Sequence, residues 1–231
     1  MNNNQFSRFE LLIGKDNFNK IKDLKVLVIG LGGVGSYVVE GLVRSGVSNL
    51  ILVDYDKIDI TNLNRQIMAN LNNIGKNKTD ILFERIKSIN SFCDVKIVNQ
   101  FIDKDNLDNL FNNSIDYVID CCDTVETKKL IIKKCLDNNI KFITCMGTGK
   151  RLDPSKLQII DIRKTSYDPL AKKIRKWVND ERLKGKIMCC CSLEKAISVD
   201  TNIIPSAIFV PASAGLLISS YVIRDVIDYE K

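Results

Sequence analysis

The turn Gly30–Gly35, with the sequence GLGGVG, constrains the fold of this 231-residue chain more than any other segment. It follows a short apolar run, Lys25–Ile29, and it opens a segment, Gly33–Gly46, whose apolar residues recur at helical spacing. Glycines in such a strand-to-helix turn let the backbone approach a phosphate group closely, and the helix N-terminus supplies oriented N–H groups. The pattern predicts a nucleotide-binding turn rather than a tight turn without a ligand.

Apolar runs and helical periodicity alternate along the chain, which is typical of a parallel α/β sheet. The predicted strands are Lys25–Ile29, Leu50–Val53, Val95–Val98, Ile115–Asp120 and Lys141–Cys145, with helices at Gly33–Gly46, Thr79–Ile89, Asn106–Phe111 and Thr124–Leu136. From Gly147 onward we expect a helix at Pro169–Val178, strands near Lys186–Cys191 and Ala207–Val210, and a final helix from Pro211. The expected fold is α/β: a Rossmann-like, doubly wound, mostly parallel sheet with a C-terminal α/β extension.

The absence of histidine excludes several kinds of chemistry. Ser-His-Asp and Cys-His catalysis need an imidazole, and so does a histidine-ligated zinc site. The eight cysteines form no CxxC pair, so we expect thiols that serve mainly as small core residues and no structural zinc.

The N-terminal segment and the most apolar stretch of the chain indicate the cellular location of the protein. The start, Met1–Gln5, is polar and has no signal-peptide pattern. The most apolar stretch, Ile203–Ile223, contains two prolines and is expected to form a buried strand and helix rather than a membrane span. We therefore predict a cytoplasmic protein without stable membrane insertion.

Acidic and basic residues follow the second predicted strand. Asp54 ends the second strand, where a carboxylate can accept hydrogen bonds from ribose hydroxyls. A nicotinamide-dependent dehydrogenase would have the same glycine turn and acid. However, a long polar connection, Asp54–Asn77, then brings Arg65, and Lys78 begins the next helix. These two cations favour a nucleoside triphosphate, because expelling pyrophosphate concentrates negative charge that they can stabilise.

The fourth predicted strand ends in Asp120-Cys121-Cys122-Asp123. Ligands of open α/β sheets bind at the carboxyl ends of the strands. One carboxylate at this edge can hold Mg²⁺ together with the phosphates.

Four ordered motifs carry a family resemblance: VLVIGLGGVGS, LVDYDKIDITNLNRQ, IGKNKTD and YVIDCCDT. Over about Leu24–Thr124 the chain resembles the ThiF/HesA/MoeB superfamily, adenylating enzymes related to ubiquitin activation. The resemblance implies one adenylating domain over residues 1–231, with a nucleotide-binding core at about 21–146 and a substrate-side extension at about 147–231. It implies ATP and Mg²⁺ as cofactors.

The same resemblance assigns individual roles. It implies catalytic roles for Arg65, Lys78 and Asp123, and Asp123 is also the implied magnesium ligand. Nucleotide contacts are implied for Gly30, Gly32, Gly33, Gly35, Asp54, Asp56, Asn62 and Gln66. Among these, Asp54 would hold the ribose, and Asp56 and Gln66 would act as supporting residues.

The flanking strings FSRFELLIG, CMGTGKRLDPSKLQIIDIRKTSYDPLAKKIRK and FVPASAGLLISSYVIRD resemble one branch, the tRNA threonylcarbamoyladenosine dehydratases. This branch implies ATP-dependent cyclisation of threonylcarbamoyladenosine in tRNA through an acyl-adenylate. Its implied partners are the modified tRNA, a second copy of the chain as a homodimer, and sulfur-transfer proteins. The alternatives are a sulfur-carrier protein adenylyltransferase, a nicotinamide-dependent oxidoreductase and a silent nucleotide-binding scaffold.

The chain departs from sulfur-carrier-activating relatives at two places. It lacks their two zinc-binding CxxC pairs, and Leu11 stands where they have a second N-terminal arginine. Arg8 is then the N-terminal candidate for a phosphate contact, across a dimer interface.

The segment Lys150–Lys186 holds twelve Lys and Arg against five Asp and Glu, and therefore carries all of the chain's net charge of +6. Such a segment is either a solvated helical face or a surface for the phosphates of tRNA.

Overall fold

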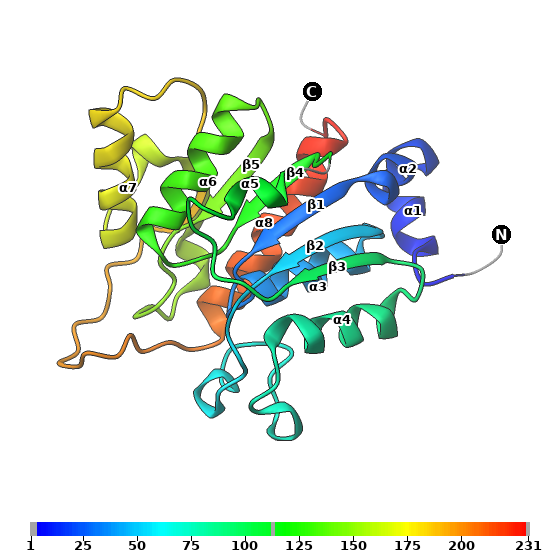
Figure 1. Cartoon of the computed structure of the whole chain (residues 1–231), viewed down its shortest axis with the longest axis horizontal. Helices are drawn as coiled ribbons and strands as arrows, with labels where there is room; N and C mark the ends of the chain where they lie inside the picture. The colour runs from blue at the N-terminus through cyan, green and yellow to red at the C-terminus, as the bar shows by residue number, and fades with distance from the viewer. Residues whose placement is uncertain (1–3, 112–113, 230–231) are drawn as a thin grey trace.

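The computed structural model describes residues 4–111 and 114–229 and contains a seven-stranded sheet (Figure 1). The strands are β1 (Lys25–Ile29), β2 (Asn49–Val53), β3 (Asp94–Val98), β4 (Tyr117–Asp120), β5 (Lys141–Cys145), β6 (Leu157–Asp161) and β7 (Met188–Ser192). Their order is β3-β2-β1-β4-β5-β7-β6, and neighbours are parallel except for β6 and β7. The predicted α/β, doubly wound and mostly parallel sheet is confirmed.

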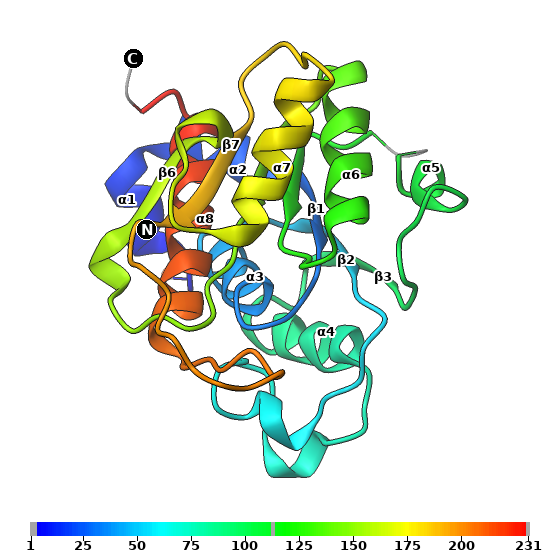
Figure 2. The same cartoon turned by 90° about the vertical axis from the view of Figure 1, so that its left-hand side faces the viewer.

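Helices cover both faces of the sheet (Figure 2). They are α1 (Ser7–Ile13), α2 (Lys15–Asp23), α3 (Gly35–Arg44), α4 (Lys78–Ile89), α5 (Leu107–Leu110), α6 (Val125–Asp137), α7 (Pro169–Asp180) and α8 (Phe209–Val226). On one face α3, α4 and α8 cover Val26 and Val28 of β1. On the other face α5 and α6 cover Leu27 and Ile29, and α7 packs beside α6. Because β1 is buried on both faces, its sequence is a continuous apolar run.

The C-terminal extension continues the same sheet. β7 pairs with β5, and the last long helix, α8, packs along α3. By length and composition α8 is apolar enough to cross a membrane. Its buried residues, among them Ala214, Ile218 and Val222, belong to the core between α3 and the sheet, so packing accounts for its apolar character.

Several details of the sequence prediction were wrong. Ala207–Val210 is not a strand: Ala207 lies in a loop and α8 begins at Phe209. A helix tolerates Pro211 there because its first turn needs no N–H donors from these positions. The edge strand β6 and the N-terminal helices α1 and α2 were not predicted, and the helix near Asn106–Phe111 is a single turn.

Gly215 sets the distance between α8 and α3. A Cβ atom there would lie 2.5 Å from the Val34 carbonyl oxygen and 2.6 Å from Tyr37 Cβ. Gly215→Ala should therefore lower the free energy of unfolding by about 1–3 kcal/mol, although alanine is the better helix former. Urea unfolding measures the change, with Ser220→Ala on the exposed face of α8 as the control. A stability equal to that of the control would show that the two helices can move apart freely.

Candidate active site

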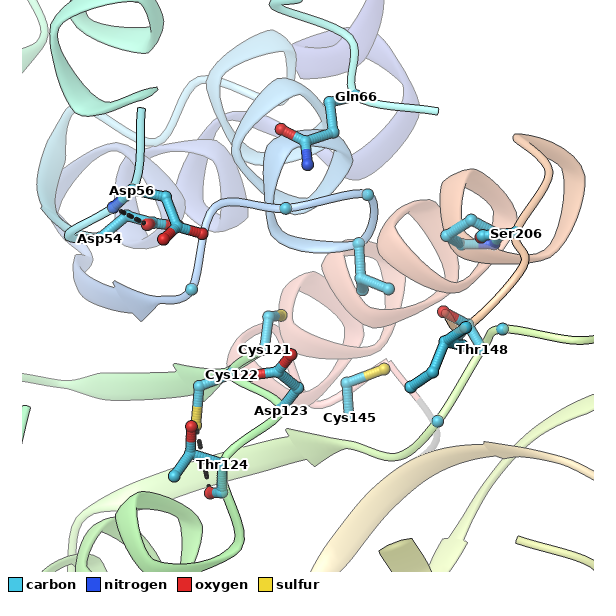
Figure 3. Close-up of a pocket in the computed structure, with 18 of the residues that line it drawn as sticks. Asp54, Asp56, Gln66, Cys121, Cys122, Asp123, Thr124, Cys145, Thr148 and Ser206 are labelled. Atoms are coloured by element: carbon cyan, nitrogen blue, oxygen red, sulfur yellow. Dashed lines mark hydrogen bonds between the residues drawn. The ribbon is translucent and has the colours of Figure 1, made fainter. Parts of the chain in front are cut away.

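A cavity of about 790 Å³ lies at the carboxyl ends of the parallel strands. The chain builds the sheet outward from β1 in one direction and from β4 in the other, and ligands of such folds bind where the order reverses. Figure 3 shows Asp54 and Asp56 on one side of the cavity, Thr148 and Ser206 on the other, and Asp123 between them.

The glycine turn forms one wall. Gly30 has a φ of +87°, and a Cβ there would lie 2.7 Å from the backbone of Cys121 and Cys122. At Gly35 a Cβ would overlap the Gly30 carbonyl oxygen, so this glycine lets the turn close on itself. Gly30, Gly32 and Gly33 line the cavity, but Gly35 lies behind them. At Gly32 the space is open, since the nearest side-chain atom is 3.9 Å from the Cβ position.

Asp54 is buried beside this turn. One carboxylate oxygen accepts the Leu31 N–H at 2.6 Å, and the other accepts the Asp56 N–H at 2.8 Å. Burial raises the pKa of Asp54, although the nearby Lys78 charge and the two N–H groups act in the opposite direction. Each oxygen keeps a further lone pair, so the fixed carboxylate can also accept hydrogen bonds from a ribose.

Lys78 and Asp56 form an ion pair at the N-terminus of α4. Lys78 Nζ lies 2.7 Å from Asp56 Oδ2, and the lysine side chain is 6% exposed while that of Asp56 is 46% exposed. The Lys78 N–H also donates to the Asp56 carbonyl. Asp56 thus holds the ammonium group at the cavity wall.

The loop between β2 and α4 supplies three more residues. Arg65 donates from Nη1 to the Thr61 carbonyl at 2.7 Å, and its side chain reaches the cavity. Asn62 is buried and accepts the Asp59 N–H. Gln66 is 5% exposed, and among the described residues its Oε1 is a buried side-chain oxygen with no hydrogen-bond partner. All three line the cavity, and the Gln66 oxygen has capacity for a ligand donor.

The two acids after β4 have different environments. Asp123 is exposed and lines the cavity, whereas Asp120 is fully buried and is paired with Lys128. The described residues include no cluster of three or more His, Cys, Asp or Glu that could hold a metal ion. A magnesium ion here would depend on Asp123 together with phosphate oxygens, which suits the few protein ligands that Mg²⁺ takes.

The described cysteines are free, and the two that follow β4 are poorly suited to act as nucleophiles. Six cysteines are buried, and Cys121 and Cys122 are half-buried. Burial raises the pKa of Cys93 to about 11 and that of Cys135 to about 12, and it also raises the pKa values of Cys121 and Cys122. The thiols of Cys121 and Cys122, which line the cavity, are thus protonated at neutral pH.

Arg151 was not singled out from the sequence. It is 3% exposed, and it donates to the carbonyls of Gly147 and Gly149 and to Asp168 Oδ2. Arg151 therefore stabilises the segment after β5 that forms this wall of the cavity. Because it is buried, it does not contribute to an exposed basic surface. Nothing local in the sequence distinguishes it from the other basic residues of the segment.

The basic residues of α7 have two kinds of environment: the lysines face solvent, and the arginine forms hydrogen bonds within the protein. Lys172, Lys173 and Lys176 are exposed, whereas Ile174 on the same helix is buried, so the charges and the apolar stripe occupy different faces. Arg175 instead donates to the carbonyl and hydroxyl of Thr165. The N-terminal candidate Arg8 is exposed on α1 and does not line the cavity.

Comparisons with known proteins give a consistent result. Residues 4–182 match the ThiF family. A tRNA threonylcarbamoyladenosine dehydratase of Bacillus subtilis is 38% identical, with coverage of 96% of this chain and 94% of the relative. The Escherichia coli enzyme of the same name, solved in complex with AMP, superposes with a TM-score of 0.92 at 33% identity, covering 98% of this chain and 95% of that one. With this match and the cavity described above, the chain belongs to the ThiF family.

Proposed function

We propose that this protein catalyses the ATP-dependent cyclisation of threonylcarbamoyladenosine in tRNA, with net loss of water. The observation that carries the proposal is the similarity, over nearly the whole length of both chains, to tRNA threonylcarbamoyladenosine dehydratases, one of them also solved in complex with ATP. The similarity includes the C-terminal extension as well as the nucleotide-binding motifs.

The cavity fits ATP. Gly30, Gly32 and Gly33 leave room for phosphates at the N-terminal end of α3, and Asp54 is fixed where it can hold a ribose. The unpartnered Gln66 oxygen has room for a ligand hydroxyl or amino group. Arg65 and Lys78 supply positive charge for the triphosphate.

The first chemical step is adenylation of the substrate carboxylate. Its oxygen attacks the α-phosphorus of ATP, the bond to the β-phosphate oxygen breaks, and pyrophosphate leaves. Arg65 and Lys78 stabilise the charge that develops on the phosphate oxygens. Asp123 would hold Mg²⁺, which neutralises phosphate charge when bound.

The second step closes the ring. A nucleophilic atom of the threonylcarbamoyl group attacks the activated carbonyl within the same molecule, a proton is released and AMP leaves. No enzyme nucleophile and no histidine are needed, which agrees with the protonated thiols of Cys121 and Cys122. The adenylated form hydrolyses readily in water, so the cavity must also exclude solvent from the carbonyl.

The proposal includes a cytoplasmic location and a homodimer. Leu11 and Leu12 on α1 are 66% and 78% exposed, an apolar surface that a second copy could cover. In such a dimer Arg8, on the same helix, would approach the partner's site rather than its own.

A pyrophosphate exchange assay tests the proposed function. We expect ATP–pyrophosphate exchange with tRNA that carries threonylcarbamoyladenosine and none with unmodified tRNA. Exchange that instead requires a sulfur-carrier protein with a C-terminal glycine would support the adenylyltransferase alternative. No exchange with either substrate would favour a nucleotide-binding scaffold, and a bound nicotinamide spectrum would indicate an oxidoreductase.

The exposed lysines of α7 give a prediction about tRNA. Changing Lys172, Lys173 and Lys176 to glutamine should reduce the salt dependence of tRNA binding, by roughly 0.7–0.9 in the slope of log K against log salt for each phosphate that is no longer neutralised. ATP affinity should stay unchanged, and Arg175 is retained because it holds Thr165. The matched control changes Lys15, Lys20 and Lys22 of α2, which leads into the amino end of β1, away from the cavity. Equal slopes for the two triple variants would show that the lysines of α7 face solvent and do not contact tRNA phosphates.

A further inference from the structure

A fully buried ion pair lies directly behind the cavity. Lys128 Nζ on α6 donates to Asp120 Oδ2 at 3.0 Å and to Thr144 Oγ1 of β5 at 3.1 Å, and the Thr144 hydroxyl donates to Asp120 Oδ2 at 2.6 Å. The side chains of Asp120 and Lys128 are at most 1% exposed. We call Asp120, Lys128 and Thr144 the buried triad. None of the three lines the cavity.

The buried triad is not explained by stability alone. Removing two charges from water costs several kcal/mol for each ion, and apolar residues of similar volume often serve a fold equally well. Burial acts to lower the pKa of Lys128, but the charge of Asp120, its hydrogen bond and the neighbouring thiol groups together raise this pKa and keep the lysine protonated. The other hydrogen bonds of the pair point to a geometric task.

The remaining oxygen of Asp120 faces the turn that carries Asp123. Asp120 Oδ1 accepts the Cys122 N–H at 3.1 Å and the Cys122 thiol at 2.9 Å. The backbone of Cys121 and Cys122 packs so closely on Gly30 that a single Cβ there would displace it. The turn is therefore fixed between Asp120 on one side and the glycine turn on the other, and Asp123 is the next residue along the chain.

We infer that the buried triad positions Asp123 for its metal: Lys128 and Thr144 hold Asp120, and Asp120 holds the Cys121–Asp123 turn so that the Asp123 carboxylate faces the phosphates. Asp120, Lys128 and Thr144 are positioning residues, since none of them touches the cavity. The inference rests on the proposed function only in the assignment of Mg²⁺ to Asp123. Groups that hydrogen-bond a metal ligand directly typically contribute 10–100-fold to metal affinity, and the lower end of this range is the effect expected here.

The test is the gain in ATP affinity that Mg²⁺ produces, measured by calorimetry with and without Mg²⁺, together with the Kd for AMP without metal. In the double variant Asp120→Leu/Lys128→Met, apolar side chains replace the ion pair and the anchor for Cys122 is removed. We expect a fold of similar thermal stability, an AMP Kd within about threefold of wild type, and a Mg²⁺-dependent gain reduced about 10-fold or more.

Three further variants separate the anchor from the charge. Asp120→Asn/Lys128→Met keeps an acceptor oxygen for Cys122 and should retain most of the gain. Thr144→Val leaves the ion pair in place and should lose part of the Mg²⁺-dependent gain in ATP affinity. Thr144→Ser keeps the hydroxyl and should show the full gain. The matched control, Glu126→Gln/Lys129→Met, removes a solvent-exposed ion pair of 2.7 Å from the same helix and should behave as wild type.

The outcomes are distinct. A full Mg²⁺-dependent gain in both Asp120→Leu/Lys128→Met and Thr144→Val would overturn the inference. If Asp120→Leu/Lys128→Met fails to fold, the comparison of Thr144→Val with Thr144→Ser tests the inference: an equal Mg²⁺-dependent gain in the two variants would overturn it. A wild-type protein that binds ATP with a Mg²⁺-dependent gain but modifies no tRNA would contradict the proposed function and leave the positioning role intact.

Discussion

Replacing Lys78 with methionine should lower the rate of adenylation by about 10²–10³-fold, the scale for losing one group that stabilises transition-state charge. The ammonium group is almost fully buried at the cavity wall and is held there by Asp56. The affinity for ATP should change much less, because the charge on the phosphate oxygens is greatest as pyrophosphate leaves. Single-turnover measurement of AMP formation separates the two effects.

Lys76→Met is the matched control for Lys78, because Lys76 is exposed two residues earlier and does not line the cavity. It should behave as wild type. The adenylation rate of Asp56→Asn should lie between those of Lys78→Met and Lys76→Met, because the ammonium group of Lys78 remains but loses its charged partner. A near-normal single-turnover rate for Lys78→Met would refute the role assigned to this residue.

The second large effect is expected at Asp54. Asp54→Ala should weaken the binding of ATP and AMP alike by about 10²-fold, because two hydrogen bonds from ribose to a carboxylate are removed, each contributing a net stabilisation of about 1.5 kcal/mol or more. The loss should not depend on Mg²⁺. Asp123→Asn is the contrasting variant: it should leave AMP binding unchanged and weaken only the metal-assisted binding and reaction of ATP.

Nucleotide titrations with and without Mg²⁺ distinguish these two defects. Excess ATP should restore the rate of Asp54→Ala, whereas excess Mg²⁺ should restore that of Asp123→Asn. If the same addition rescues both variants equally, the separate assignments to ribose and to metal are wrong.

The strands of the sheet were predictable from the sequence where the hydrophobic pattern of the residues matches their burial in the fold. β1 is a continuous apolar run because both of its faces are covered, and the glycine turn after it marks the start of α3. β6 was missed because it is a half-buried edge strand whose residues, LQIID, show neither a continuous run nor a clean alternation. The start of α8 was misplaced because Ala207–Val210 is apolar, and an apolar run of four residues does not distinguish strand from helix.

Asp54 and Asp123 were predictable at the cavity because each follows a parallel strand, and parallel strands end at the same edge of a sheet. Asn62 and Gln66 lie in the long loop after β2, and their place at the cavity was implied by the family resemblance. Side-chain pairing was not predictable in this way. A charge count over Lys150–Lys186 treats Arg151 and Lys172 alike, yet one is buried among carbonyl groups and the other faces solvent. The same limit applies to Asp120 and Asp123, because only the fold turns one carboxylate toward Lys128 and the other toward the cavity.

Mass spectrometry of the tRNA product tests the central claim most directly. The purified protein is incubated with ATP, Mg²⁺ and tRNA that carries threonylcarbamoyladenosine, and the tRNA is then digested to nucleosides. The proposed function predicts that the modified nucleoside loses one water, with one AMP and one pyrophosphate formed for each conversion, and that Lys78→Met abolishes most of this signal. An unchanged nucleoside mass in the presence of a folded protein that binds ATP would contradict the claim.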